Sequence, residues 1–376
     1  MTTHSHSQMF LHRCLRGRWF PDALPTPADG VDWDALVHAA HAGGASPLLY
    51  HTLRGRNLLP PSAEEALRID YYANARRNLF LFRELAGLLT ALSAAGVDVL
   101  LLKGAALAEA VYDNPAVRPM GDLDLLVREA RVPDALRVLS GLGYAITPPA
   151  AYRNEIVLQK HAAVGVILEL HWQLFVSPAH HQTIPADWLW DTALPVQVEG
   201  APAWILGPEA QILHLCGHLV LHHDGEAPRT IWLHDVAEVI ALYHDRIDWE
   251  NVLARAQAYG LLGAVQNVVG RVVDDWQAPV PPGVQARLRT LRPSPAEGRV
   301  QNWLVDAHTS GAHRFLADLR SISGIAGRFR FLWRNLFPPP GYVRYCYGVR
   351  HAALVPLYYP YRWLKGMFGA LRRSKP

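Results

Sequence analysis

The stretch that decides the fold covers residues 97–127 and reads VDVLLLKGAALAEAVYDNPAVRPMGDLDLLV. It begins with an apolar run and a Lys-Gly turn, and it ends with Gly-Asp-Leu-Asp before a second apolar run. Because side chains alternate between the two faces of a strand, Asp122 and Asp124 are expected to point the same way. Two like charges held side by side repel each other, which a folded protein tolerates mainly when a cation lies between them. The pair therefore predicts a Mg²⁺ site.

A third acid follows in a later apolar run, VILELHW, where Glu169 lies between two leucines. If this run pairs with the strand of Asp122 and Asp124, the three carboxylates converge on one patch of a sheet. Such a trio suits two Mg²⁺ ions that take their other ligands from water and a triphosphate. The alternative for each acid is a solvated or ion-paired surface group. His171, two residues further on, should share the face of Glu169 and orient the metal ligands through hydrogen bonds without binding the metal itself.

Lys103 and Gly104 form a turn suited to phosphate. Glycine lets the backbone come close to a ligand, and the helix that follows would begin with free N–H groups that attract phosphate. Lys103 would add a compact positive charge. Arg118, four residues before Asp122, would either clamp a phosphate or hold the acidic loop in place.

Length and composition fit a globular protein. The 376 residues suffice for two or three domains; half are hydrophobic and 18% are charged. The N-terminus lacks the apolar core of a secretory signal, and no stretch approaches the roughly 20 apolar residues of a membrane span. Cys14, Cys216 and Cys346 are too far apart in sequence for a CxxC site. We therefore expect a cytoplasmic protein.

Local patterns divide the chain into four expected parts. These are an N-terminal helical region (1–96), a sheet core (97–206), a C-terminal helical domain (207–318) and a basic aromatic tail (319–376).

In the first part, Asp32 is expected to cap a helix. Ser62 would begin a capping box that opens a long helix ending near Gly96. In the core, apolar runs and helical patterns follow the order β-α-β-α-β-β, and a hairpin follows Pro195. This order predicts an α+β fold, with a mixed sheet that carries helices on one side.

The tail differs from the rest of the chain in charge. Residues 319–376 hold eleven Arg or Lys and no Asp or Glu, whereas residues 1–318 hold 25 basic and 33 acidic groups, a net charge of −8. The tail also contains twelve aromatic residues. This composition suits peripheral contact with an anionic membrane, on its cytoplasmic face, or with nucleic acid such as RNA. The alternative is a tail that packs over its own acidic protein.

Histidines form a second cluster. His214, His218 and His222 recur every four residues, and His234-Asp235 follows in the next helical segment. The pattern is similar to metal phosphohydrolases of the HD type, which would place a transition metal near His218 and Asp235. The alternative is a polar seam in which His218 or His222 bonds Asp235. A further interpretation is that this seam faces the predicted metal site and contacts the second substrate there, the acceptor of a transferred group.

The sequence resembles the uncharacterised nucleotidyltransferase family of the DNA-polymerase-β-like superfamily. The resemblance rests on LLKGAALAEAVY, VRPMGDLDLLV and VILELHW, and it extends to the HLVLHH and WLHDVAEVI motifs. The Lys-Gly, Arg and Asp-x-Asp arrangement is also similar to abortive-infection nucleotidyltransferase toxins. The resemblance implies that Asp122 and Asp124 bind both metals, and that Glu169 binds the catalytic one and helps activate an acceptor hydroxyl. Ala105 departs from the family pattern, which has Ser or Gly there, and the gap from Gly104 to Asp122 is longer than usual.

Together these features predict a Mg²⁺-dependent transfer of a nucleoside monophosphate from an NTP to an acceptor, with release of pyrophosphate. The acceptor would be a sugar, a lipid-linked phosphate, a peptide or protein side chain, or an RNA end. The alternative, motivated by Ala105, is a catalytically weak scaffold that binds a nucleotide and recruits a partner or a membrane.

Overall fold

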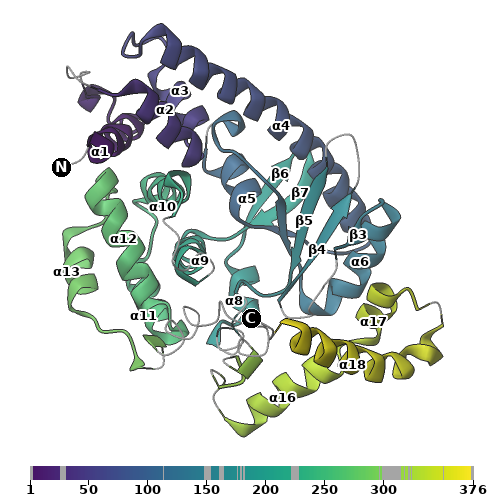
Figure 1. Cartoon of the computed structure of the whole chain (residues 1–376). Helices are drawn as coiled ribbons and strands as arrows, with labels where there is room; N and C mark the ends of the chain where they lie inside the picture. The colour runs from purple at the N-terminus through teal and green to yellow at the C-terminus, as the bar shows by residue number, and fades with distance from the viewer. Residues whose placement is uncertain are drawn as a thin grey trace.

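A computed structural model of the chain describes residues 3–25, 31–112, 114–147, 154–160, 165–175, 177, 180, 183–221, 228–295, 297–298, 315–316, 318–320, 322, 324–349 and 351–373. The fold is α+β, with one mixed sheet among many helices (Figure 1). None of the described helices combines the length and the apolar character needed to cross a membrane.

Seven strands form the sheet in the order β3-β4-β5-β2-β1-β7-β6. Their bounds are β1 (Leu100–Leu101), β2 (Leu123–Leu126), β3 (Ala145–Ile146), β4 (Glu155–Lys160), β5 (Val166–His171), β6 (Leu194–Val198) and β7 (Ala201–Ile205). β2 runs parallel to β5 and β1 runs parallel to β7, whereas the other neighbours are antiparallel. The mixed sheet and the hairpin after Pro195 are confirmed, and β3 is an additional strand.

The helices before and within the sheet region partly follow the sequence pattern. They are α1 (Thr3–Arg16), α2 (Trp33–Ala42), α3 (Ser46–Leu53), α4 (Pro61–Ala94), α5 (Lys103–Ala110), α6 (Val132–Gly141) and α8 (Ala186–Asp191). Asp32 caps α2 by accepting from the Ala35 N–H at 2.9 Å, as predicted. The capping box at Ser62 is wrong, because α4 begins one residue earlier at Pro61 and no side chain caps it. Proline at the first helical position favours this start.

The remaining described helices follow the sheet. They are α9 (Pro208–Leu221), α10 (Thr230–Tyr243), α11 (Trp249–Tyr259), α12 (Leu262–Trp276), α13 (Pro282–Thr290), α16 (Ile325–Leu336), α17 (Pro340–Tyr347) and α18 (Val355–Arg373). The three tail helices, α16 to α18, lie together at one end of the molecule (Figure 1).

Two hydrophobic cores meet at the sheet. Leu100 and Leu102 belong to a core built mainly from α1 to α3 and α9 to α13, whereas Leu101 belongs to a core that includes α6 and the C-terminal half of α4. This division follows from the alternation of side chains along an extended strand. The expectation of helices on only one side is therefore wrong at the central strands β1 and β2, where both faces are buried, whereas Ile167 of β5 and Trp204 of β7 are exposed. The tail joins the second core through α17, where Tyr342 and Val343 are buried.

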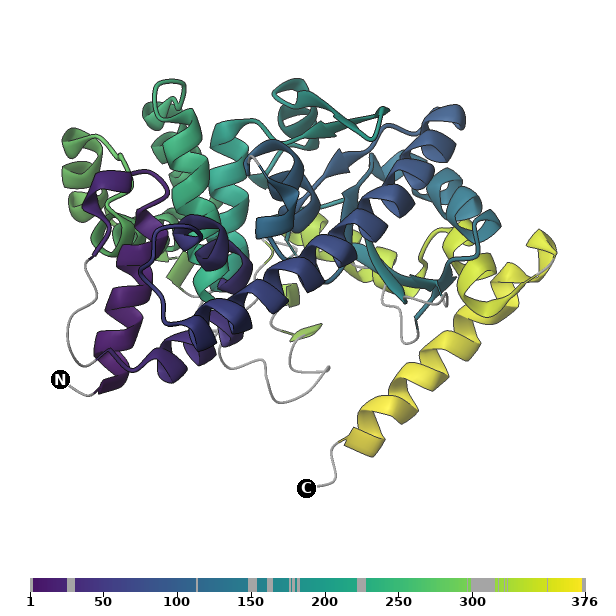
Figure 2. The ribbon, with the colours of Figure 1, turned by 90° about the horizontal axis from the view of Figure 1, so that it is seen from above.

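The long helix α4 connects the two cores. Its 34 residues span about 50 Å. Leu67 and Tyr71 are buried in the first core, and Leu81 and Leu85 are buried in the second. Figure 2 shows α4 running diagonally across the molecule, from the N-terminal helices toward the sheet.

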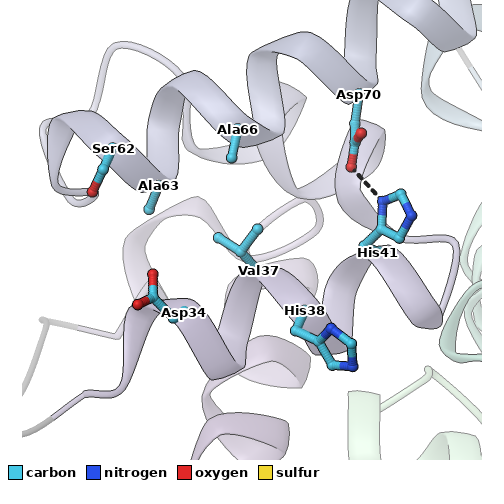
Figure 3. A pocket seen from close by; sticks show the side chains of 8 residues that line it. All are labelled: Asp34, Val37, His38, His41, Ser62, Ala63, Ala66 and Asp70. Carbon is cyan, nitrogen blue, oxygen red and sulfur yellow. Dashed lines mark hydrogen bonds and ion pairs between the residues drawn. The ribbon is translucent and has the colours of Figure 1, made fainter.

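A surface hollow of about 330 Å³ lies between α2 and the start of α4 (Figure 3). In it the Nδ1 atom of His41 lies 2.9 Å from an Asp70 carboxylate oxygen. The residues that line it are Asp34, Val37, His38, His41, Ser62, Ala63, Ala66 and Asp70. The hollow contains none of the carboxylates of the predicted metal site.

Candidate active site

Polar side chains of α4 hold the loop that leads to the acidic strand. Asn78, 1% exposed, donates to the carbonyl oxygens of Pro115 (2.6 Å) and Arg118 (2.8 Å). Arg77 donates to the carbonyl oxygens of the two residues before Asp122, both at 3.0 Å. The sequence analysis missed this role, although two asparagines four residues apart, Asn74 and Asn78, are unusual in a helix that otherwise buries apolar residues.

The register of the sheet brings the acids together. β2 and β5 are neighbours, and Asp124 lies directly opposite Glu169 in their parallel pairing. Asp122 precedes β2 by one residue and lies in a bend rather than in the strand itself. Its pKa is nevertheless raised, first by burial and then by the charges of Asp124 and Glu169, so the three carboxylates share one electrostatic environment. We call this side of β2 and β5 the acidic face.

Lys103 supplies a cation to the acidic face. Its Nζ atom donates to Asp124 Oδ1 at 2.7 Å and to Glu169 Oε2 at 3.4 Å. Burial alone would lower the pKa of Lys103, but the two carboxylates raise it above its ordinary value. The backbone of Lys103 has φ +45°, a left-handed conformation that costs a non-glycine residue about 1–3 kcal/mol and is found preferentially at functional sites. The first residue of α5 is thus strained where its ammonium reaches the acids.

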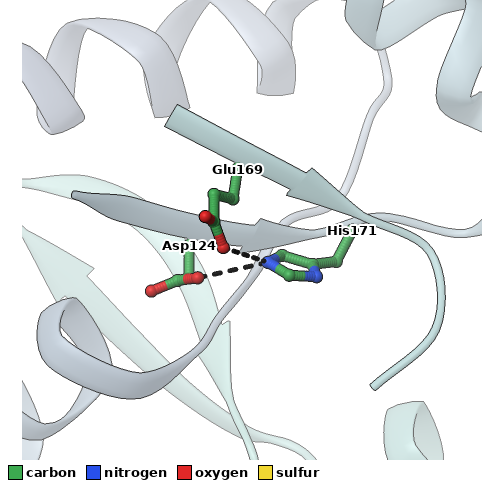
Figure 4. Close-up of side chains that lie close together, drawn as sticks. All are labelled: Asp124, Glu169 and His171. Atoms are coloured by element: carbon green, nitrogen blue, oxygen red, sulfur yellow. Dashed lines mark hydrogen bonds and ion pairs between the residues drawn. The ribbon is translucent and has the colours of Figure 1, made fainter. Parts of the chain in front are cut away.

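His171 binds three carboxylates at once. Its Nε2 atom lies 3.1 Å from Asp124 Oδ1 and 3.3 Å from Glu169 Oε2 (Figure 4). Its Nδ1 atom lies 3.2 Å from Glu155 Oε2, because β4 pairs Glu155 directly opposite His171. Burial alone would lower the pKa of His171, but its contacts with the three carboxylates, Asp124 first, outweigh burial and raise the pKa to about 10. His171 is therefore an imidazolium at neutral pH.

The surroundings perturb Asp122 and Glu169 in opposite directions. The pKa of Asp122 is raised to about 6, first by burial and then by Asp124 and Glu169. The pKa of Glu169 is held well below its ordinary value, first by its hydrogen bond to His171. Opposite shifts of neighbouring carboxylates are common at functional sites.

Several of these groups could hold a metal ion. Asp124, Glu169 and His171 each offer one ligand atom, and these atoms lie within 4.8 Å of one another. Among the described residues, no other such group of acids, histidines or cysteines forms. The oxygens of the acidic face match the oxygen ligands that Mg²⁺ prefers. His171 in its protonated form would act instead as a supporting donor.

The turn at Gly104 lies close to the acidic loop. A Cβ atom at Gly104 would lie 3.2 Å from Met120 Cγ and 3.4 Å from Arg118 Nη1, so a side chain there would displace its neighbours. Ala105, the departure from the family pattern, is 1% exposed and belongs to the second core. No side chain caps α5, whose first turn holds both residues.

Arg118 is bound to Asp235 of α10. Its Nη2 atom donates to Asp235 Oδ2 at 2.6 Å, and its Nε atom lies 3.1 and 3.2 Å from the two carboxylate oxygens. Both residues are buried, and the hydroxyl of Tyr112 also donates to Asp235 at 2.9 Å. Of the two predicted roles, this geometry matches the one that holds the acidic loop in place.

The ion pair of Arg118 with Asp235 also explains the role of Asp235, the acid of the predicted histidine cluster. Asp235 is bound by Arg118 and Tyr112, in place of the predicted bond from His218. The His218 ring lies 6.2 Å from the ring of His214. His222 falls outside the described residues. The described part of the chain therefore gathers no metal ligands at this cluster.

A comparison with protein-family models identifies the family of this chain. The chain belongs to the uncharacterised nucleotidyltransferase family, whose model matches residues 29–273. The matched span contains the acidic face, the Lys-Gly turn and the Arg118–Asp235 pair, and it confirms the family resemblance seen in the sequence.

One solved structure with some similarity is that of an antigenic nucleotidyltransferase-like protein from Paracoccidioides brasiliensis. The similarity covers 53% of this chain and 92% of that chain, at 15% sequence identity and a TM-score of 0.39. None of the curated proteins matches this chain.

Proposed function

We propose that this protein is a Mg²⁺-dependent nucleotidyltransferase that moves a nucleoside monophosphate from an NTP to an acceptor hydroxyl and releases pyrophosphate. The observation that carries the proposal is the pairing of Asp124 opposite Glu169, with the Lys103 ammonium within 3.4 Å of both. A cation already lies between these carboxylates, at the place where the sequence predicts a metal. Membership of the nucleotidyltransferase family supports the same reaction class.

The charge at the site favours a divalent cation. Four carboxylates and two cationic groups gather there: Asp122, Asp124, Glu155 and Glu169, with Lys103 and His171. With all six groups charged, the net charge is −2, which a divalent ion would neutralise. The raised pKa of Asp122 has the same cause, because burial and like charges leave its carboxylate short of positive partners. When bound, Mg²⁺ would polarise the phosphoryl oxygens and lower the pKa of the acceptor hydroxyl.

Lys103 and Gly104 would bind the phosphates. Once a metal ion neutralises Asp124 and Glu169, the Lys103 ammonium is free to turn toward a triphosphate. The N–H groups at the start of α5 would donate to the same anion, which the positive end of the helix dipole also attracts. The bond from Arg118 to Asp235 would keep the loop of Asp122 at a fixed position over this turn.

In the transfer step an acceptor oxygen forms a bond to the α-phosphorus, and the bond from that phosphorus to the β-phosphate oxygen breaks. The departing electron pair leaves with pyrophosphate. Glu169, whose side chain is 23% exposed, would accept a hydrogen bond from the acceptor hydroxyl and help to activate it, and the released proton passes to solvent water; the side chain of Asp124 is only 2% exposed. We propose Asp122 and Asp124 as ligands of two Mg²⁺ ions and Glu169 as a ligand of one.

Transfer of label from α-³²P-labelled NTPs to candidate acceptors tests the proposal. The acceptors to compare are a sugar, a lipid-linked phosphate, a peptide and an RNA end. We expect Mg²⁺-dependent transfer that is lost in Asp122→Ala with Asp124→Ala. Transfer undiminished in this double variant would exclude the acidic face as the catalytic site.

The scaffold alternative gives a different result. It requires nucleotide binding without turnover on any acceptor, so a single productive acceptor rules it out. The burial of Ala105 in the second core means that this departure from the family pattern lies away from solvent.

A further inference from the structure

Two helices of the tail leave large apolar side chains uncovered. Along α16, Ile325, Phe329 and Trp333 recur every four residues, which places them on one face of the helix. They are 86%, 65% and 54% exposed. Three side chains of α18 follow at spacings of four and three residues, which also share one helical face, and each is more than half exposed: Leu357, Tyr361 and Leu364. We call these six side chains the tail surface.

The two helices pack against each other through specific contacts. The indole N–H of Trp363 donates to the Leu336 carbonyl oxygen at 2.9 Å, and Arg362 donates to the Asn335 carbonyl oxygen at 2.8 Å. The ring of Phe337 packs edge-on against Trp363, with centroids 5.3 Å apart. Figure 2 shows α18 extending away from the body of the molecule. The two helices therefore hold each other in place, and each exposes its apolar side chains to solvent.

The tail residues beside the tail surface carry positive charge, although Arg334, next to Trp333, is ion-paired with Glu129. Arg328 and Arg330 are exposed on either side of Phe329, and Lys365 is exposed beside Leu364. No acid occurs from residue 319 onward, against eleven basic residues. An exposed apolar patch flanked by one sign of charge marks a surface for a partner of the opposite charge.

We propose that the tail surface docks on an anionic lipid bilayer. The apolar side chains would enter the region between headgroups and acyl chains, and the arginines and lysine would bind the headgroups. RNA would gain from stacking on Phe329 and Trp333, but it would gain nothing from the aliphatic Ile325 or Leu357. A second copy of the chain would bring two strongly basic tails together, which charge repulsion opposes. This docking does not depend on the proposed transfer reaction.

Sedimentation of the full chain with lipid vesicles tests the proposal. The vesicles are phosphatidylcholine alone, and phosphatidylcholine mixed with the anionic phosphatidylglycerol. We expect binding to the mixed vesicles only, weakened by added salt. Phe329→Ser with Trp333→Ser should reduce the bound fraction at least about tenfold. The matched control, Ile69→Ser with Leu79→Ser, removes two exposed apolar side chains of α4 and should leave binding unchanged.

The charge is tested separately with Arg328→Gln and Arg330→Gln, each of which should weaken vesicle binding about fivefold. Arg328 also donates to the Ile322 carbonyl oxygen at 3.1 Å, so Arg330→Gln is the cleaner of the two tests of charge. Protein that stays in the supernatant with anionic vesicles at low salt overturns the proposal. Binding of a single-stranded RNA, or formation of a dimer, that the serine variant abolishes while vesicles bind nothing also overturns it. So does an equal loss of vesicle binding in the α4 control.

Discussion

At the scale of single residues, the site holds more carboxylates than positively charged side chains. Lys103 and His171 together contact Asp124, Glu155 and Glu169, while Asp122 keeps a pKa of about 6. The lysine is bound to the carboxylates at the place where we propose that a metal ion binds. This competition can be measured.

Lys103→Met should destabilise the metal-free protein by about 3 kcal/mol, because it leaves the buried Asp124 without its closest cation. Mg²⁺ should recover most of this loss, since the ion would neutralise the same carboxylates. The free energy of unfolding is measured by urea denaturation with EDTA and with Mg²⁺.

The matched control is Lys160→Met, which breaks a 2.6 Å ion pair between Lys160 of β4 and Glu84 of α4. Its effect should be the same with and without Mg²⁺. If Lys103→Met loses as much stability in Mg²⁺ as in EDTA, the lysine and the ion do not share a site.

His234, which lies outside the acidic face, should make the free energy of unfolding depend on pH. Its pKa is lowered to about 3, first by burial and then by the charges of Arg18 and His12. Below pH 6.5 the unfolded chain binds a proton that the folded chain does not, so stability falls as the pH falls. Between pH 6.5 and 5 this residue should cost about 2 kcal/mol.

In His234→Gln, the loss of stability from pH 7 to pH 5 should therefore be smaller than in wild type by about 2 kcal/mol. Urea denaturation at both pH values measures it, and the exposed His41→Gln serves as control. An unchanged pH dependence in His234→Gln would show that this imidazole is protonated in the folded state.

At the scale of elements, α10 and the acidic loop are joined by a pair 117 residues apart in sequence. Arg118→Met should destabilise the protein by about 3–5 kcal/mol, because it leaves the Asp235 carboxylate buried and unpaired. The double variant Arg118→Met with Asp235→Leu should recover part of this loss. A double-mutant cycle from urea denaturation tests this, and a double variant as unstable as the sum of its single variants would argue against direct coupling.

Local patterns in the sequence predict much of the sheet but little of what joins its parts. The two-residue alternation places Asp124 and Glu169 on equivalent faces, and only the adjacency of β2 and β5 has to be assumed. The sequence analysis missed Glu155 as a partner of His171, although the spacing of the two apolar runs indicates it. β4 and β5 pair antiparallel with a register symmetric about position 163, midway between the two apolar runs in the sequence, and this register places Glu155 opposite His171.

Other features follow from tertiary contacts and leave no local pattern. The apolar run from Val97 predicts a whole strand, yet only Leu100 and Leu101 pair, because burial by helices on both faces also selects apolar residues. The bond from Arg118 to Asp235 depends on how α10 packs against the sheet, and no spacing in the sequence indicates it. The Ser62 capping box failed because the Pro60-Pro61 pair set the start of the helix.

At the scale of the whole molecule, the acidic face lies at the boundary between two cores. Leu126, on the same face as Asp124, is buried in the core of the N- and C-terminal helices, while Leu125 is buried in the other. The long helix α4 contributes to both cores and also holds the loop of Asp122. The predicted division at residues 96, 206 and 318 therefore remains a prediction about sequence segments, since each core draws on more than one of them.

The most direct test of the central claim is the melting temperature of the full chain with each of the four NTPs, in Mg²⁺ and in EDTA. An NTP present at about 100 times its dissociation constant should raise the melting temperature of wild type by about 3 °C. We expect this rise in Mg²⁺ only, unchanged in the exposed-site control Asp187→Asn and absent in Asp124→Asn. An equal rise in Asp124→Asn, or no rise with any NTP in wild type, would contradict a nucleotide site at the acidic face.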